Sequence, residues 1–121
     1  MFSAEHLPLY ERKANLFKGL AHPYRIRVLE ILSSQPEASV SQMLEDTGLE
    51  ASHLSQHLSV LRRYGLVVSE RQANLVSYRL AHAGVADLLQ VSRGLLSSML
   101  EDTQGQLDSL GELPGINRST T

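Results

Sequence analysis

The chain has 121 residues, enough for one domain with a modest core, and its hydrophobic (42%) and charged (20%) fractions exclude a disordered protein. Aromatic residues make up only 5%, with no Trp, which argues against binding single strands by base stacking. The absence of Cys excludes disulfides and thiolate metal ligands. No apolar run reaches the roughly 20 residues of a membrane helix, and the N-terminal segment MFSAEHLPLYERK lacks the basic and then apolar layout of a signal peptide, so we expect a cytoplasmic protein.

The charge is distributed unevenly. The net charge is −2, yet residues 51–81 hold four arginines against one glutamate, a local charge of +3. A basic patch on an acidic body suits a protein that approaches phosphate in one orientation, although an ordinary surface strip is the alternative.

The first third of the chain predicts two helices. Apolar residues spaced among charges predict an amphipathic helix over 9–20, weakened near its end by Gly19. Pro23 fits the first position of a second helix that reaches about Ser33. The side chains expected to face inward from this helix are Ile26, Leu29, Ile31 and Leu32.

A helix-turn-helix is predicted over about 39–64. Ser39 and Gln42 have the spacing of a capping box, and Gly48 is a typical stop for the short helix that follows. A brief link then leads to a helix over about 52–64, which we call the reading helix, with Gly65 as a left-handed stop.

The remaining sequence predicts a hairpin, a long helix and a tail. β-rich runs at 66–68 and 76–80, joined by a turn over 71–74 in which Asn74 takes the turn conformation, form a β-hairpin or wing over about 66–80. Apolar residues at helical spacing predict a helix over about 83–110, whose end Gly105 and Gly111 loosen. Residues 113–121 are expected to be a flexible tail. The fold class is mainly α with a small β-hairpin (α+β), in a single domain over 1–112.

The reading helix has two dissimilar faces. At about 100° per residue, Leu54, Leu58 and Leu61 fall in one narrow stripe that packs on the core. The opposite face carries Ser, Gln and Arg, which can hydrogen-bond base edges in a DNA major groove. These outward residues are Ser52, Gln56, Ser59 and Arg63, with Arg62 beside them in the last turn.

An ordinary solvated helix is the alternative for this face, but residues 51–69 contain no acid, which favours contact with phosphate. His53 and His57 are four residues apart, so DNA contact, a half-buried structural role and a metal site all stay open for this pair. Arg71 near the wing turn is a candidate for contact with phosphates or a minor groove. Tyr78 is expected in the core.

Three segments together resemble the arsenic-repressor (ArsR/SmtB) family of bacterial winged-helix regulators. They are LFKGLAHPYRIRVLEIL, SVSQMLEDTGLEASHLSQHLSVLRRYGLV and SERQANLVSYRL, and the resemblance covers about residues 16–80. It implies a homodimeric repressor that binds an inverted repeat in double-stranded DNA and dimerises through its long first and last helices. It also implies groove contacts by Ser52, His53, Ser55, Gln56 and His57, and a wing contact by Arg71.

Two features depart from the family pattern. The wing turn commonly has Gly where this chain has Ala73, so the hairpin geometry can differ. The metal sites of the family's sensors use cysteines, or Asp and His from the last helix. Here Asp87 is present but no histidine follows His82, so we expect no metal and no other cofactor.

The residues therefore predict a sequence-specific DNA-binding regulator, most simply a repressor. The alternative is a winged-helix protein-interaction module that works with a separate sensory co-regulator, which the missing metal site suggests. An enzyme is not expected, because no nucleophile–base pair or phosphate-binding loop is present and Glu101-Asp102 is a lone, solvated acidic pair.

Overall fold

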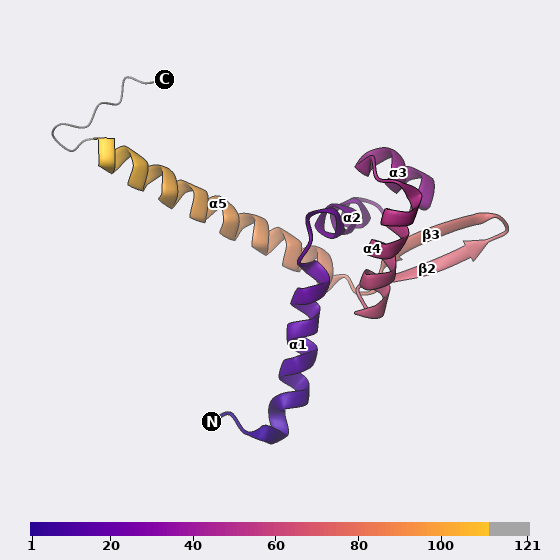
Figure 1. Ribbon diagram of the computed structural model, residues 1–121, viewed down its shortest axis with the longest axis horizontal. Helices are drawn as coiled ribbons and strands as arrows, with labels where there is room; N and C mark the ends of the chain where they lie inside the picture. The colour runs from indigo at the N-terminus through magenta and orange to yellow at the C-terminus, as the bar shows by residue number, and fades with distance from the viewer. Residues whose placement is uncertain (112–121) are drawn as a thin grey trace. The chain divides into compact units, whose positions relative to one another are not determined.

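The computed structural model describes residues 1–111 and is built mainly from helices with one small sheet, as the sequence predicts (Figure 1). The predicted tail over 113–121 lies outside the described residues. The elements, in chain order, are η1 (Ala4–His6), α1 (Leu7–Leu20), α2 (Pro23–Ser34), β1 (Ala38–Ser39), α3 (Val40–Thr47), α4 (Ala51–Arg63), β2 (Val67–Gln72), β3 (Leu75–Leu80) and α5 (Gly84–Gly111).

The chain divides into two compact units, residues 1–86 and the part that begins at Asp87. The first unit holds every element from η1 to β3 and the first residues of α5. The second holds most of α5. No described helix is long and apolar enough to cross a membrane.

The core of the first unit lies where α2, α3, α4 and the sheet meet. Its fully buried side chains are Val28, Leu29, Met43, Leu54, Leu61, Leu66 and Val67. Burying a side chain of this size contributes about 1.5–3 kcal/mol each, so these residues dominate the stability of the unit.

The inward face of α2 differs from the prediction at one position. Pro23 does occupy the first turn, and Leu29, Ile31 and Leu32 are buried as expected. Ile26, however, is 38% exposed, and Val28, which was not expected to face inward, is fully buried. At 100° per residue Ile26 falls opposite the middle of the buried stripe, which explains the error.

The helix-turn-helix forms as the sequence predicts. Ser39 caps α3 with a full capping box: Gln42 N donates to Ser39 Oγ at 3.1 Å, and Ser39 N donates to Gln42 Oε1 at 2.8 Å. Gly48 ends α3 with a φ of 70°, and Gly65 follows α4 with a φ of 74°. Both glycines therefore occupy the left-handed region that other residues rarely adopt.

The sheet contains one strand more than the predicted hairpin. Its order is β1-β3-β2, and all pairs are antiparallel. The two-residue strand β1 pairs with Ser77 and Tyr78 of β3, and it was not expected because so short a run has no recognisable alternation. Tyr78 is buried, as predicted.

The wing turn also differs from expectation. Strand β2 continues through Arg71 and Gln72, so only Ala73 and Asn74 form the turn. Asn74 lies in the turn, as expected, and Ala73 beside it is the left-handed residue, with a φ of 56°. The chain therefore keeps the usual two-residue geometry and places alanine in a conformation that favours glycine.

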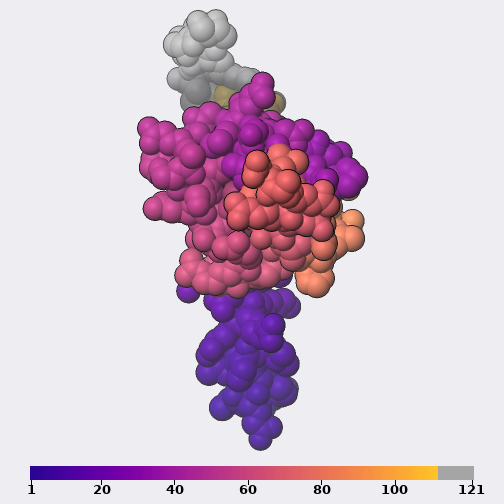
Figure 2. Space-filling view, turned by 90° about the vertical axis from the view of Figure 1, so that its right-hand side faces the viewer, coloured from indigo at the N-terminus to yellow at the C-terminus, as the bar shows by residue number. Residues whose placement is uncertain are grey.

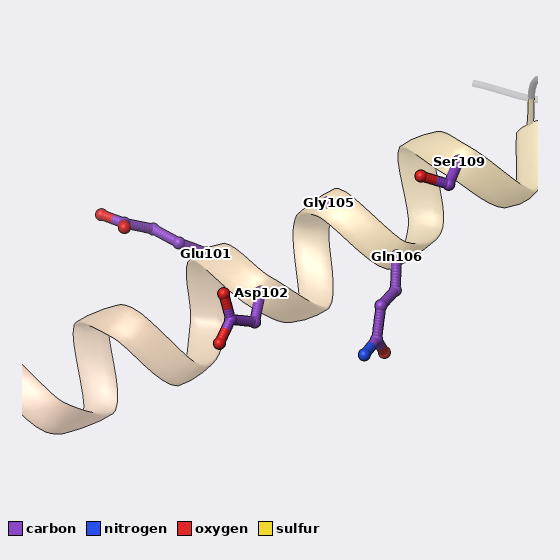
Figure 3. Close-up of a pocket in the computed structure, with 5 residues that line it drawn as sticks. All are labelled: Glu101, Asp102, Gly105, Gln106 and Ser109. Atoms are coloured by element: carbon purple, nitrogen blue, oxygen red, sulfur yellow. The ribbon is translucent and has the colours of Figure 1, made fainter.

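Helix α5 is uninterrupted over its 28 residues, so Gly105 does not loosen its end. A row of its apolar side chains is exposed: Val91, Leu95, Leu96, Met99, Leu100, Leu107 and Leu110. Figure 3 shows a shallow pocket on this helix, and all five residues that line it come from α5 alone. Glu101 and Asp102 are exposed there, as expected for a solvated pair.

Candidate nucleic-acid interface

Helix α4 is positioned by its leucine seam. Leu54, Leu58 and Leu61 are 0–2% exposed and pack into the core, as predicted. Because these three residues define one side of the helix, the opposite side must face outward. Ser52, Gln56, Ser59 and Arg63 lie on that side and are all exposed.

Two backbone features hold the ends of α4. Glu50 is its N-cap residue, and three residues separate the end of α3 from the start of α4. At the other end Gly65 N donates to the carbonyl of Arg62 at 3.0 Å, and Leu66 N donates to the carbonyl of Leu61 at 2.9 Å. These bonds satisfy terminal carbonyls and turn the chain sharply into β2.

The structure gathers most of the predicted contact residues on one helix. Eight of the nine are exposed: Ser52, His53, Ser55, Gln56, Ser59, Arg62, Arg63 and Arg71. Seven of these belong to α4, and Arg71 lies on β2, next to the wing turn and opposite Val76. Helix α4 and β2 are in contact, and Figure 2 shows the wing (salmon) projecting from the molecule beside the magenta surface of α3 and α4.

The ninth residue, His57, is half-buried. Its ring lies against His22, with ring centroids 4.3 Å apart, and against Tyr24 at 6.2 Å. This placement supports the structural alternative for His57, whereas His53 is free to face a ligand. No group of three or more His, Cys, Asp or Glu among residues 1–111 is arranged to hold a metal ion.

Burial and basic neighbours lower the pKa of His57. Burial is the largest cause, followed by the positive charges of His22, Arg25 and His53. The sequence gives no sign that His22 and Arg25 act on His57, because they lie more than 30 residues from it and no short motif links them.

The electrostatics of the exposed face of α4 favour anions. The helix carries Arg62 and Arg63 in its last turn, and no acid stands within it. The Arg63 guanidinium lies over the Tyr64 ring, 5.6 Å from its centre, and the residue is exposed. Such a face can offer hydrogen bonds to bases and positive charge to the flanking phosphates.

Comparison with known proteins agrees with this geometry. A family model described as a helix-turn-helix domain matches residues 20–70. The HTH-type transcriptional regulator Rv0081 of Mycobacterium tuberculosis is 47% identical over 107 residues, covering 88% of this chain and 93% of its own. The chain belongs to the ArsR/SmtB family of winged helix-turn-helix regulators.

Solved structures of this family match the fold. The crystal structure of Rv0081 has a TM-score of 0.73 and 48% identity, covering 79% of this chain and 96% of that one. The homodimeric winged helix-turn-helix DNA-binding domain of Mb0332 from Mycobacterium bovis, a possible ArsR-family regulator, has a TM-score of 0.75 and 28% identity, covering 84% and 93%. A biofilm growth-associated repressor of Agrobacterium fabrum is 38% identical over 88 residues, covering 69% and 74%. These relatives are regulators and not enzymes.

Proposed function

We propose that this protein is a homodimeric transcriptional repressor that binds an inverted-repeat operator in double-stranded DNA. Helix α4 enters the major groove, and the wing contacts the flanking backbone or minor groove. The observation that carries this proposal is the exposed, acid-free face of α4 directly opposite its buried leucine seam. A merely solvated helix would carry the Glu and Lys that this face lacks.

The contact residues divide by chemistry. Gln56 can make paired hydrogen bonds to adenine N6 and N7 and Arg63 can bond guanine, so these two side chains are proposed to read sequence. Ser52, Ser55 and Ser59 are small enough to let the helix backbone approach the bases. We assign to His53, Arg62 and Arg71 the contacts with phosphates that fix the position of the protein along the duplex, with His57 on the flank of the helix.

The exposed apolar residues support the dimer. Helix α5 carries its apolar row, and α1 exposes Leu9, Tyr10 and Phe17. Apolar side chains in such number on a soluble domain mark a protein interface. Two copies joined in this way present two α4 helices to half-sites about one DNA turn, roughly 34 Å, apart. We accordingly assign residues 1–112 to one functional domain, with α5 as its dimerisation helix.

The decisive experiment is selection of genomic fragments bound by the purified protein, with and without divalent metal. It is followed by a gel shift of the selected duplex against a scrambled duplex of equal length. We expect a complex that survives competition at moderate salt and footprints an inverted repeat. Loss of the complex to equal amounts of scrambled competitor would contradict the proposal. A stable partner protein recovered together with an absence of any DNA affinity would favour an interaction module instead.

A further inference from the structure

A cluster of three rings connects the start of α2 to α4. The ring centroids of His22 and Tyr24 lie 6.1 Å apart, and those of His22 and His57 lie 4.3 Å apart. The Tyr24 and His57 rings are nearly parallel at 28°, with centroids separated by 6.2 Å. These residues, which we call the ring cluster, come from the α1–α2 link, the first turn of α2 and the middle of α4.

Hydrogen bonds hold the α1–α2 link, which carries His22 of the ring cluster. His22 is the N-cap of α2, and its Nδ1 accepts a hydrogen bond of 3.2 Å from the backbone N–H of Tyr24. Arg25 ties the same turn to the end of α1, donating from Nε to the Gly19 carbonyl at 2.8 Å and from Nη2 to the Lys18 carbonyl at 3.0 Å. The position of His22 is therefore fixed independently of α4.

The charges that act on His57 are all basic. They are His22 from the α1–α2 link, Arg25 from α2 and His53 from α4 itself, while Tyr24 from α2 places its ring against His57. Helix α1 contributes the carbonyls that Arg25 already binds. A proton on His57 would sit half-buried among these groups, so the packed arrangement favours the neutral ring.

We propose that the ring cluster positions α4 for DNA only while His57 is neutral, so that acidification releases α4 from α2 and weakens specific binding. This inference rests on the proposed reading of DNA by α4. Its geometric basis is that His57 and Gln56 are neighbours on α4. A movement of the flank of α4 that carries His57 must therefore also move the face that carries Gln56. The leucine seam holds one flank of α4, and the ring cluster holds the flank beside it.

The first test follows the His57 imidazole by NMR titration of the free protein. The variant is His22→Asn, because Asn is a strong N-cap that keeps the acceptor for Tyr24 N but removes the ring and its proton. We expect the midpoint of His57 to rise by a few tenths of a unit, about a twofold gain in proton affinity. His82→Asn, which alters an exposed histidine outside the cluster, should leave the midpoint unchanged. An unchanged midpoint in His22→Asn would overturn the proposal.

The second test measures specificity against pH. The readout is the ratio of Kd for the scrambled duplex to Kd for the selected duplex, which cancels the general effect of positive charge on DNA affinity. From pH 7.5 to 5.5 we expect this ratio to fall about threefold or more in the wild type, as His57 gains a proton. It should fall clearly less in His22→Asn, with His82→Asn matching the wild type.

Equal losses in the wild type and His22→Asn would overturn the coupling. A protein that shows the NMR shift but no preference for the selected duplex at any pH would contradict the proposed function and not the ring contact. If His22→Asn does not fold, as judged by its NMR spectrum, His22→Gln removes the same ring and decides the question by the same two readouts.

Discussion

Arg27 of α2 and Asp46 of α3 form a bidentate ion pair. Its Nε lies 2.8 Å from Asp46 Oδ1, and its Nη2 lies 2.7 Å from Asp46 Oδ2. Arg27 also reaches Glu30 at 3.6 Å on its own helix. The pair joins the helix that carries much of the core to the first helix of the helix-turn-helix. It therefore links α2 to α3 at the surface of the first unit.

Replacement of Asp46 by Asn should reduce the acid sensitivity of folding. The hydrogen bond from Arg27 lowers the pKa of Asp46 below its ordinary value of 3.8. Its contribution is therefore present above pH 3.8 and lost as the pH falls through the lower, folded value. We expect Asp46→Asn to lower Tm slightly at pH 7, with the difference from the wild type vanishing in 1 M salt and at about pH 2. Thermal melts across pH check this, and a difference that persists at high salt would contradict it.

At Gly19, helix propensity favours alanine whereas packing favours glycine. In an exposed helix Gly→Ala stabilises by up to about 1 kcal/mol. Gly19 is buried, however, and a Cβ there would stand 2.7 Å from Leu66 Cδ1 and 3.3 Å from Tyr64 Cβ. Because Leu66 is itself buried, we expect Gly19→Ala to destabilise by about 1–2 kcal/mol. Urea denaturation measures this, and Gly105→Ala on α5, where a Cβ meets nothing within 4 Å, is the control with the opposite sign.

Ala73→Gly should stabilise the wing. Ala73 has a φ of 56°, and the left-handed region costs a non-glycine residue about 1–2 kcal/mol. Part of that gain is offset by the greater freedom of glycine in the unfolded chain, so we expect a net gain of about 0.5 kcal/mol. Gly65→Ala, at a φ of 74° and with open space around it, should lose about 1 kcal/mol. Chemical denaturation of both variants checks the pair, and a loss in Ala73→Gly would show that the turn carries no strain.

Local patterns were sufficient to predict most of the first unit. The capping box at Ser39 and the glycine stops at Gly48 and Gly65 depend on neighbours within a few residues, and the leucine seam depends on one period. The predictions from the sequence were wrong where the position of a residue or the formation of a strand depended on tertiary packing. Ile26 has the right chemistry for the core but the wrong angle around α2, and β1 exists only because β3 lies beside it.

The candidate interface shows the same division. Outward exposure of Gln56 and Arg63 follows from the helical period and the buried leucines, so the sequence predicts it. The contact between His57 and His22 cannot be predicted in this way. His22 is brought to His57 by the α1–α2 link, which Arg25 holds by a hydrogen bond to the end of α1. Contacts between distant segments of this kind require the fold, and they decide whether a histidine faces DNA or a neighbouring ring.

Gln56→Ala should loosen the sequence preference of the protein. The side chain is exposed at the middle of the outward face, where a paired bond to adenine contributes about 1–3 kcal/mol of discrimination. We expect affinity for the selected duplex to fall about tenfold or more while affinity for scrambled DNA stays the same. Competitive gel shifts measure both values. An equal loss on both duplexes would show that Gln56 acts on the backbone or on folding.

Arg62→Ala should behave in the opposite way. Arg62 is exposed in the last turn of α4 but lies to one side of the outward face, so we assign it to phosphate. Its removal should weaken binding to selected and scrambled duplexes by the same factor. It should also reduce the slope of log K against log salt by about 1 per protomer, since one fewer counterion is released. Titrations at four salt concentrations measure the slope. Lys13→Ala, an exposed cation on α1, is the matched control and should leave the slope unchanged. An unaltered slope in Arg62→Ala would remove this residue from the interface, whereas a loss confined to the selected duplex would move it among the residues that read bases.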